Sequence, residues 1–408
     1  MKYISPILSP AALILLTLLS FSCKQKPKNA EETEKCFDKH LLTPAQQAVI
    51  RKQIHADEKA KRLDSLFQKK FKSQGFNGTV LVAQKGVIIY ENAFGYSDFR
   101  KKTPLNLNSG FQLASISKTF TGVGILILAQ EGKLSIDDSI QKFIPNFPYH
   151  GIHIEDLLSH RSGLPNYLYA FEDKRKLNGP PPNNDTIIDW FCKADPLPPA
   201  YNKPGCFFSY NNSNFMLLAA IIERVSGMKY AEFLQKRIFT PLDMFHTYID
   251  TLAPDSLLKL KTSGHNGNHE RERDFYDGVY GDKGIYSTVE DLSRWYFGLY
   301  HECILNRHWL DLAFTPRSFE KRSRHNYGLG FRIMTQPTDM KKVEFIYHGG
   351  WWAGYSTMFW SNPDKEYVII VLGNKKSTSV YQVQPIVQIL EGSKQADKDA
   401  NGESSDTL

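Results

Sequence analysis

The strand-like segments of this 408-residue chain lie towards its two ends and enclose a long stretch of helical patterns. Residues 78–84 and 87–93 alternate or run apolar around Lys85-Gly86, which is typical of a β-hairpin. Four further strands are predicted late in the chain, at 328–333, 342–347, 355–360 and 367–372. Because helices separate the two groups, we predict an α/β (α+β) sandwich, in which one antiparallel sheet of N- and C-terminal strands is flanked by helices.

Helical periodicity fills the segments around and between these strands. The predicted helices cover 44–71, 115–131, 154–160, 212–225, 289–299 and 380–390. The central ones should form a mostly α-helical subdomain. Residues 172–205, which are rich in Pro, Asn and charge, are expected to be a long surface loop beside a cleft.

The N-terminus has the pattern of an export signal. Lys2 precedes an apolar run over 11–19, which is short for a membrane span, and Ser20-Phe21-Ser22-Cys23 follows. Small residues before a cysteine resemble a bacterial lipoprotein cleavage site, so Cys23 is the predicted lipidation site. The alternative is an ordinary signal peptide with an incidental cysteine. An anchored protein of the bacterial cell envelope, facing the periplasm, is expected.

The predicted organisation is therefore a signal peptide at 1–22, a lipoprotein tether at 23–42, one domain at 43–391 and a disordered tail at 392–408. An exported compartment permits disulfides. Cys192 and Cys206 bracket a Pro-rich loop, and a bridge between them or two free thiols remain open, as does the pairing of Cys36 and Cys303.

Composition and motifs argue against several classes of function. The net charge of +7 is spread along the chain, without a basic stripe interleaved with aromatic residues, which argues against nucleic-acid binding. A phosphate-binding glycine loop and the Gly-x-Ser-x-Gly nucleophile motif are both absent from the sequence. The histidines at 150, 153 and 160, and those at 265 and 269, follow no familiar ligand spacing, so no metal and no cofactor are predicted.

The chemistry is concentrated in Ser115-Ile116-Ser117-Lys118 at the start of a long apolar run. A hydroxyl and an amine three residues apart lie on one face of a helix, where the amine can share the serine's proton. The tetrapeptide pattern alone is weak, since it also occurs at Ser139, Ser226, Ser256 and Ser318. What distinguishes Ser115 is the order of two later motifs, Tyr210-Asn211-Asn212 and His348-Gly349-Gly350.

This order of Ser-x-x-Lys, Tyr-x-Asn and His-x-Gly resembles the serine β-lactamase and penicillin-binding-protein superfamily. Within it the chain is similar to the class C-like branch, which holds β-lactamases, D,D-carboxypeptidases, D-aminopeptidases and carboxylesterases. The resemblance runs from about residue 78 to 390 and includes the segments 132–138, 157–165 and 284–288.

The resemblance implies a role for each motif residue. Ser115 would be the nucleophile of an acyl-enzyme, Lys118 would share its proton, and Tyr210 would act as a base across the cleft. A packed aromatic ring is the alternative for Tyr210. Asn212 would hold Lys118 or a substrate amide, or would cap the helix that it begins.

The third motif is expected to bind substrate. Backbone N–H groups of Ser115 and Trp351 would form the oxyanion hole, and Gly350, with its neighbour Gly349, would let the strand edge approach the substrate. Trp351-Trp352 would line an aromatic wall, with one of the two in the core. His348 departs from the lysine common in the superfamily, and a histidine is mostly neutral at pH 7.5.

These residues predict an exported serine hydrolase that forms an acyl-enzyme on an ester or amide, including a D-amino-acid peptide, a peptidoglycan peptide or a β-lactam. The neutral His348 favours substrates other than carboxylate-bearing β-lactams. The alternative function is a non-catalytic, peptidoglycan-binding envelope protein that keeps the same fold. The expected signature of that alternative is loss of Ser115, Lys118 or Tyr210, and all three are present.

Overall fold

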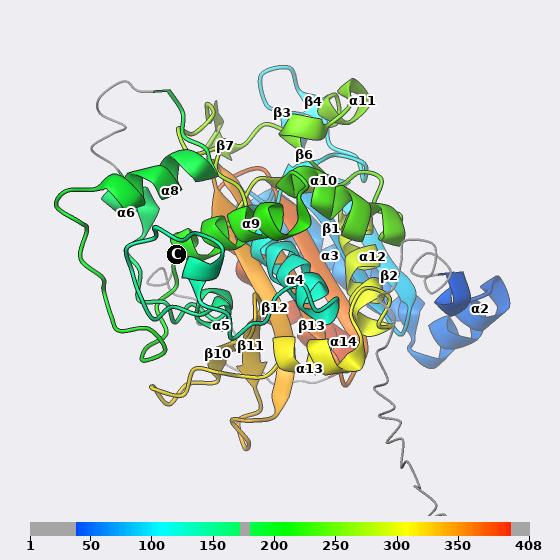
Figure 1. Cartoon of the computed structure of the whole chain (residues 1–408). Helices are drawn as coiled ribbons and strands as arrows, with labels where there is room; N and C mark the ends of the chain where they lie inside the picture. Colours follow the sequence, from blue (N-terminus) through cyan, green and yellow to red (C-terminus); the bar gives the residue numbers. More distant parts are fainter. Residues whose placement is uncertain (1–37, 172–179, 393–408) are drawn as a thin grey trace, which may run out of the picture.

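The computed structural model describes residues 38–171 and 180–392 (Figure 1). The predicted signal peptide, Cys23, Cys36, most of the tether and the tail from residue 393 onwards lie outside these residues. Within the described ranges, every helix is too short or too polar to traverse a bilayer.

One seven-stranded antiparallel sheet forms the centre of the molecule, in the order β10-β11-β12-β13-β14-β1-β2. The predicted meeting of N- and C-terminal strands is confirmed, because β1 pairs with β14 and places Gly78 opposite Gly373. The strands are β1 Gly78–Gln84, β2 Val87–Phe94, β3 Tyr96–Asp98, β4 Thr103–Pro104, β5 Phe111–Gln112, β6 Tyr248–Ile249, β7 His265–Asn266, β8 His269–Glu270, β9 Ile285–Ser287, β10 His325–Tyr327, β11 Arg332–Thr335, β12 Val343–Trp352, β13 Tyr355–Asn362 and β14 Tyr367–Gly373.

Helices cover both faces of this sheet, and α5, α6 and α8 lie together to one side of it (Figure 1). The α-helices are α2 Pro44–Gln53, α3 Ala56–Gln74, α4 Ser117–Gln130, α5 Ile154–Leu158, α6 Tyr167–Ala170, α8 Asn184–Lys193, α9 Asn212–Ser226, α10 Tyr230–Leu234, α11 Asp255–Leu258, α12 Val289–Tyr300, α13 Arg307–Ala313 and α14 Gln384–Glu391. Short 3₁₀ or π turns are η1 Ala114–Ile116, η2 Ile140–Lys142, η3 Gln235–Phe239, η4 Thr240–Leu242, η5 Asp250–Leu252 and η6 Thr378–Tyr381.

Burial of the sheet on both faces explains why β14 is a continuous apolar run. Ile369 and Val371 pack into the cluster that includes residues of α3 and α14. Ile370 and Leu372 point to the opposite face and join the larger cluster that contains α4, α9 and α12. Because α4 lies inside this larger cluster, residues 117–129 are all buried, and Lys118 is buried with them.

Three predicted elements differ from the structure. The single helix expected over 44–71 is two helices, α2 and α3, because His55 between them adopts a left-handed conformation with φ of 53°. The expected loop at 172–205 contains the helix α8, which Asn183 caps and whose apolar residues pack against α9. The many Pro, Asn and charged residues of this segment obscured the apolar periodicity of the amphipathic helix α8.

The strand predicted at 328–333 is largely wrong. Only its last two residues belong to β11, and the rest forms the connection between β10 and β11. Leu329 and Phe331 are fully buried there, and the Gly330 N–H donates to the Leu158 carbonyl. Burial against helices, rather than strand pairing, therefore accounts for the apolar residues of this segment.

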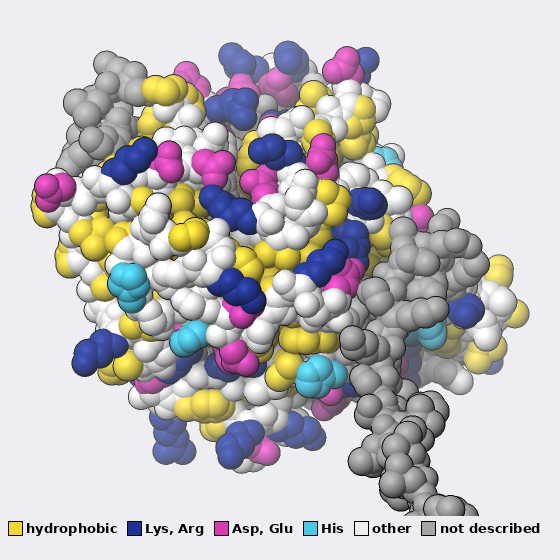
Figure 2. All heavy atoms as spheres, in the orientation of Figure 1, with side chains coloured by type: hydrophobic (Ala, Val, Ile, Leu, Met, Phe, Trp, Pro, Cys, Tyr) yellow, Lys and Arg dark blue, Asp and Glu magenta, His cyan; other side chains and the backbone are white. Residues whose placement is uncertain are grey.

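Two cysteines whose pairing was open are free. Cys192 is partly buried and Cys206 is exposed, whereas Cys303 takes part in a disulfide bond. The surface is mixed in charge: over the described part of the face in Figure 2, Lys and Arg side chains alternate with Asp and Glu.

Candidate active site

A cavity of about 410 Å³ brings together residues of the three sequence motifs. It opens between the end of β12, the turn η1 and the segment that leads into α9. Its lining residues are Ser115, Asn166, Leu168, Tyr169, Phe208, Ser209, Tyr210, Asn212, Asp282, Lys283, Lys321, Trp351 and Trp352.

Ser115 and Lys118 are in direct contact beneath this cavity. Ser115 lies on η1, and Lys118 follows on the first turn of α4. The Lys118 ammonium donates to Ser115 Oγ at 3.0 Å and to the Asp282 carbonyl oxygen at 2.9 Å. Lys118 is fully buried, so water does not compete for either bond. The pair therefore holds the serine oxygen at one fixed position.

Gly350 allows the turn that carries Ser115 to pack against β12. A Cβ at this position would lie 2.2 Å from the Leu113 carbonyl oxygen and 2.3 Å from Thr357 Oγ1. The preceding residue of the turn, Ala114, is left-handed with φ of 50°. Gly350 therefore lies close to the backbone at Leu113, and its predicted approach to a substrate stays a prediction.

The Tyr210 hydroxyl is buried and has no hydrogen-bond partner among the described residues. Two cations lie near its ring centre, namely Lys118 Nζ at 5.0 Å and the Arg332 guanidinium at 4.9 Å. Tyr210 and Ser115 line the same cavity, yet no hydrogen bond joins them. The Tyr210 hydroxyl therefore has an unused hydrogen-bonding capacity close to two cations.

Asn212 lines the cavity, but Asn211 is the residue that caps α9. The Asn211 side chain accepts from the Ser213 N–H at 2.9 Å, so helix capping by Asn212 is wrong by one residue. Lys118 is held by the Asp282 carbonyl and makes no hydrogen bond to Asn212. Contact with a substrate amide is the role that remains predicted for Asn212.

His348 is fully buried and does not line the cavity. Its Nδ1 lies 2.7 Å from the Gly349 carbonyl oxygen, which can only accept, so Nδ1 carries the proton. Nε2 then accepts from the Tyr327 hydroxyl at 3.2 Å. Burial lowers the pKa of His348 well below its usual value, and the nearby Arg332 and Lys118 cations lower it further. The third motif therefore supplies no cation.

The end of β12 offers a free strand edge to the cavity. β11 pairs with residues 343–347 of β12 and reaches no further along it. Residues 348–352 continue as a strand that pairs only with β13. Residues 348–350 are buried, and the Gly350 carbonyl accepts from the Tyr381 hydroxyl at 2.7 Å. The edge is exposed only at Trp351, where an extended ligand could bind by main-chain hydrogen bonds. Trp351, which is 39% exposed, lies at this edge, while Trp352 is partly buried.

Sequence reasoning missed Asp282 and Lys283, which form part of the cavity wall. The Lys283 ammonium donates to the Tyr167 hydroxyl at 2.6 Å and lies 3.4 Å from the Asp282 carboxylate. It also lies 4.8 Å from the Trp352 ring centre. Burial lowers the pKa of Lys283, and the Asp282 carboxylate opposes this change. Two charged residues between Gly281 and Gly284 were the available signal in the sequence.

The comparisons with known proteins agree with this geometry. A model of the family described as Beta-lactamase matches residues 63–392, which is most of the chain. The chain belongs to the Beta-lactamase family. The wider serine β-lactamase and penicillin-binding-protein superfamily suggested by the motifs is thereby confirmed.

The relatives of this Beta-lactamase family member include two proteins with penicillin-binding names and one without. Penicillin-binding protein 4* of Bacillus subtilis is 34% identical over 350 residues, covering 82% of this chain and 75% of the relative. Protein flp of Staphylococcus aureus is 26% identical over 325 residues, covering 74% of this chain and 60% of that protein. The octameric penicillin-binding protein homologue from Pyrococcus abyssi superposes with a TM-score of 0.70 at 26% identity, covering 83% of this chain and 78% of that one.

Two buried histidines near the site predict that acid destabilises the fold. Burial lowers the pKa of both His160 and His348 well below 6.5, so only the unfolded chain takes up their protons as the pH falls. The free energy of unfolding should then drop below about pH 6.5, by up to about 1.4 kcal/mol per pH unit for each histidine. Asp291 acts oppositely, since its burial raises its pKa to about 6. Urea unfolding of wild type and His160→Gln between pH 7 and 5 separates these contributions.

The variant is expected to lose the share of this pH dependence that His160 contributes. An identical slope in the two proteins would show that His160 is protonated in the folded state.

Proposed function

We propose that this protein is a serine hydrolase that forms an acyl-enzyme at Ser115 and acts on esters or amides. The observation that carries the proposal is the 3.0 Å contact between a fully buried lysine ammonium and the Ser115 hydroxyl at a ligand-sized cavity. A lysine so placed has no solvent-facing role, and its two partners are the serine and a backbone carbonyl.

In the proposed reaction, Ser115 Oγ attacks the acyl carbon of the substrate. One member of the Lys118–Tyr210 pair must start without its proton, as the lysine amine or the tyrosine phenolate; this base takes the serine proton and then gives it to the leaving alcohol or amine. The backbone N–H groups of Ser115 and Trp351 would stabilise the oxyanion, with Trp351 on the free edge of β12. A water molecule then attacks the acyl-enzyme, returns a proton to Ser115 through the same groups and releases the acid.

The charges around the cavity favour substrates that have no carboxylate next to the bond that is cleaved. His348 is neutral and lies outside the cavity, while Lys283 is already held by Asp282 and Tyr167. The other lining lysine, Lys321, is an exposed side chain outside the three motifs. We therefore propose an esterase or D-peptidase of the class C-like branch, for which β-lactams are poor substrates. The rival is a binding protein that retains the fold without turnover.

Labelling with two active-site probes tests this proposal. A fluorophosphonate should react with Ser115, as mapped by mass spectrometry, and p-nitrophenyl acetate should be hydrolysed. Benzylpenicillin should turn over at least about 100-fold more slowly than by a dedicated β-lactamase, because the third motif supplies no cation. Labelling of another serine, or efficient penicillin turnover, would contradict the proposal. Absence of both labelling and hydrolysis would favour the binding protein.

We also propose that the protein is exported and anchored at Cys23, on the strength of the N-terminal sequence pattern. Fractionation of cells into washed membranes and soluble extract tests this, and recovery of all protein in the soluble extract would oppose it.

A further inference from the structure

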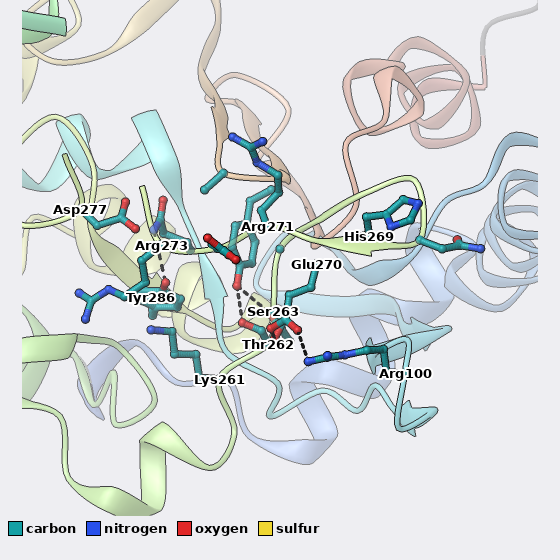
Figure 3. Close-up of a pocket in the computed structure, with 16 residues that line it drawn as sticks. Arg100, Lys261, Thr262, Ser263, His269, Glu270, Arg271, Arg273, Asp277 and Tyr286 are labelled. Atoms are coloured by element: carbon teal, nitrogen blue, oxygen red, sulfur yellow. Dashed lines mark hydrogen bonds and ion pairs between the residues drawn. The ribbon is translucent and has the colours of Figure 1, made fainter. Parts of the chain in front are cut away.

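The tip of the β12–β13 hairpin borders two cavities. Trp351 and Trp352 line the catalytic cavity, whereas Ala353 and Tyr355 line a second cavity of about 680 Å³ (Figure 3). The backbone at this end of β12 is therefore not packed closely on both sides. Hydrogen bonds must decide how its peptide units are oriented, including the unit that carries the Trp351 N–H.

The turn at the tip determines which way the Trp351 N–H points. Ala353 and Gly354, with φ of 45° and 89°, form a two-residue turn between the paired residues Trp352 and Tyr355. Positive φ at both positions is typical of a type I′ turn, whose flanking residues form a hydrogen-bonded pair. Because hydrogen-bonded and non-hydrogen-bonded pairs alternate along an antiparallel ladder, the N–H and carbonyl of Trp351 point away from β13. They face the edge that β11 leaves unpaired.

The carbonyl of the same peptide unit belongs to Gly350 and faces the opposite way. The bond between Gly350 and Trp351 is trans, so this carbonyl points towards β13. There it accepts from the Tyr381 hydroxyl at 2.7 Å. Because a peptide unit is planar, a hydrogen bond that fixes its carbonyl also fixes the direction of its N–H.

The hydrogen bond from Tyr381 also makes the Trp351 N–H a stronger donor. Hydrogen bonds that follow one another through an amide polarise each other, so an amide whose carbonyl accepts a bond donates more strongly. A donor aimed at the substrate carbonyl oxygen contributes most when that oxygen becomes an oxyanion.

Tyr381 is itself held in place by a buried lysine. It ends η6, which packs against β13 and β14. The Lys70 ammonium of α3, which is only 2% exposed, donates to the Ser379 carbonyl at 2.8 Å and to Gln382 Oε1 at 3.2 Å. These two acceptors lie on either side of Tyr381 in the sequence. Lys70 therefore stabilises the turn that presents the Tyr381 hydroxyl, although it has no part in the proposed reaction.

The other expected oxyanion donor, the Ser115 N–H, is held by different contacts. Its turn, η1, follows Leu113, and the Leu113 carbonyl accepts from Thr357 Oγ1 at 2.8 Å. Loss of the Tyr381 hydroxyl should therefore affect the Trp351 donor and leave the nucleophile in place.

We propose that Tyr381 is a positioning residue of the oxyanion hole: its hydroxyl holds the Gly350 carbonyl and thereby directs the Trp351 N–H at the substrate. Tyr381 lines neither cavity, so it acts through this peptide unit and not on the reacting atoms. The inference rests on the proposed function, because it assigns a residue to the stabilisation of that reaction's oxyanion. It predicts an effect on rate more than on affinity, since the donor matters most in the transition state.

The test is Tyr381→Phe, which removes the hydroxyl and keeps the ring. Both kcat and kcat/KM for p-nitrophenyl acetate should fall by about 10-fold with KM unchanged, as expected when an interaction of the transition state is weakened. For p-nitrophenyl thionoacetate, in which sulfur replaces the carbonyl oxygen, the fall should be about twofold or less, because sulfur is a weak acceptor. The ratio of the two rates thus reports on the oxyanion hole, which a general loss of stability would not change.

The matched control is Tyr149→Phe. Its hydroxyl also donates to a backbone carbonyl, that of Pro198 at 2.5 Å, but Tyr149 lines neither cavity. This variant should keep the wild-type kcat and the wild-type ratio of the two esters. An unchanged kcat in Tyr381→Phe, an equal fall for the two esters, or a change in KM alone would overturn the inference. Absence of ester hydrolysis by the wild type would instead refute the catalytic proposal, and this inference with it.

Discussion

Replacing Ser115 with alanine is expected to reduce kcat/KM for p-nitrophenyl acetate by about 1,000-fold or more, because the covalent route is lost with the hydroxyl. The fold should persist. Ser115 is only partly buried, and Lys118 keeps its hydrogen bond to the Asp282 carbonyl. The free energy of unfolding should stay within about 0.5 kcal/mol of wild type. Steady-state kinetics and urea unfolding of the same preparation measure both quantities.

Ser256→Ala is a suitable control for this experiment. Ser256 begins another Ser-x-x-Lys pattern on a helix, but it is exposed and lies in neither cavity. Its replacement should change neither activity nor stability. Hydrolysis that survives in Ser115→Ala would mean that another residue is the nucleophile.

Replacing Gly350 with alanine is expected to destabilise the protein by about 3 kcal/mol and to remove most of the hydrolytic activity. The added Cβ would lie 2.2 Å from the Leu113 carbonyl oxygen, so the turn or the strand must move. Because Ser115 is two residues beyond Leu113, such a shift displaces the nucleophile from Lys118. Thermal unfolding and ester hydrolysis measure the two effects.

Gly151→Ala provides the comparison, since Gly151 has φ of 77° and open space around its Cβ position. That variant should lose about 1 kcal/mol from its left-handed backbone alone and keep its activity. If Gly350→Ala unfolds and hydrolyses the ester like wild type, η1 and β12 can move apart to admit the Cβ without displacing Ser115.

Local patterns predicted most of the individual strands and the serine–lysine pair, because both depend on short-range spacing. The hairpin at residues 78–93 and the three-residue separation of Ser115 from Lys118 follow from the repeats of strand and helix. Assignments that depend on single residues were less accurate. Asn211 rather than Asn212 caps α9, and His55 divides the predicted helix in a segment that has no Gly or Pro after Pro44.

Tertiary proximity accounts for the functional residues that the sequence did not reveal. Arg332 follows an unremarkable apolar stretch, yet the pairing of β11 with β12 places it over the Tyr210 ring. Lys283 is an ordinary charged residue in the sequence, and becomes notable only because Tyr167 and Trp352 surround it. Neither arrangement follows from a period or a motif, since both bring together segments that are far apart in the sequence.

The pairing of β1 with β14 has a consequence for how the protein matures. Because residue 78 lies opposite residue 373, the main-chain hydrogen bonds between β1 and β14 can form only after nearly the whole polypeptide has been synthesised. Contacts so distant in sequence slow folding and prolong the lifetime of incomplete intermediates. A truncated product that ends before β14 would expose two unpaired strand borders at once, those of β13 and β1, and should aggregate rather than accumulate as a stable fragment.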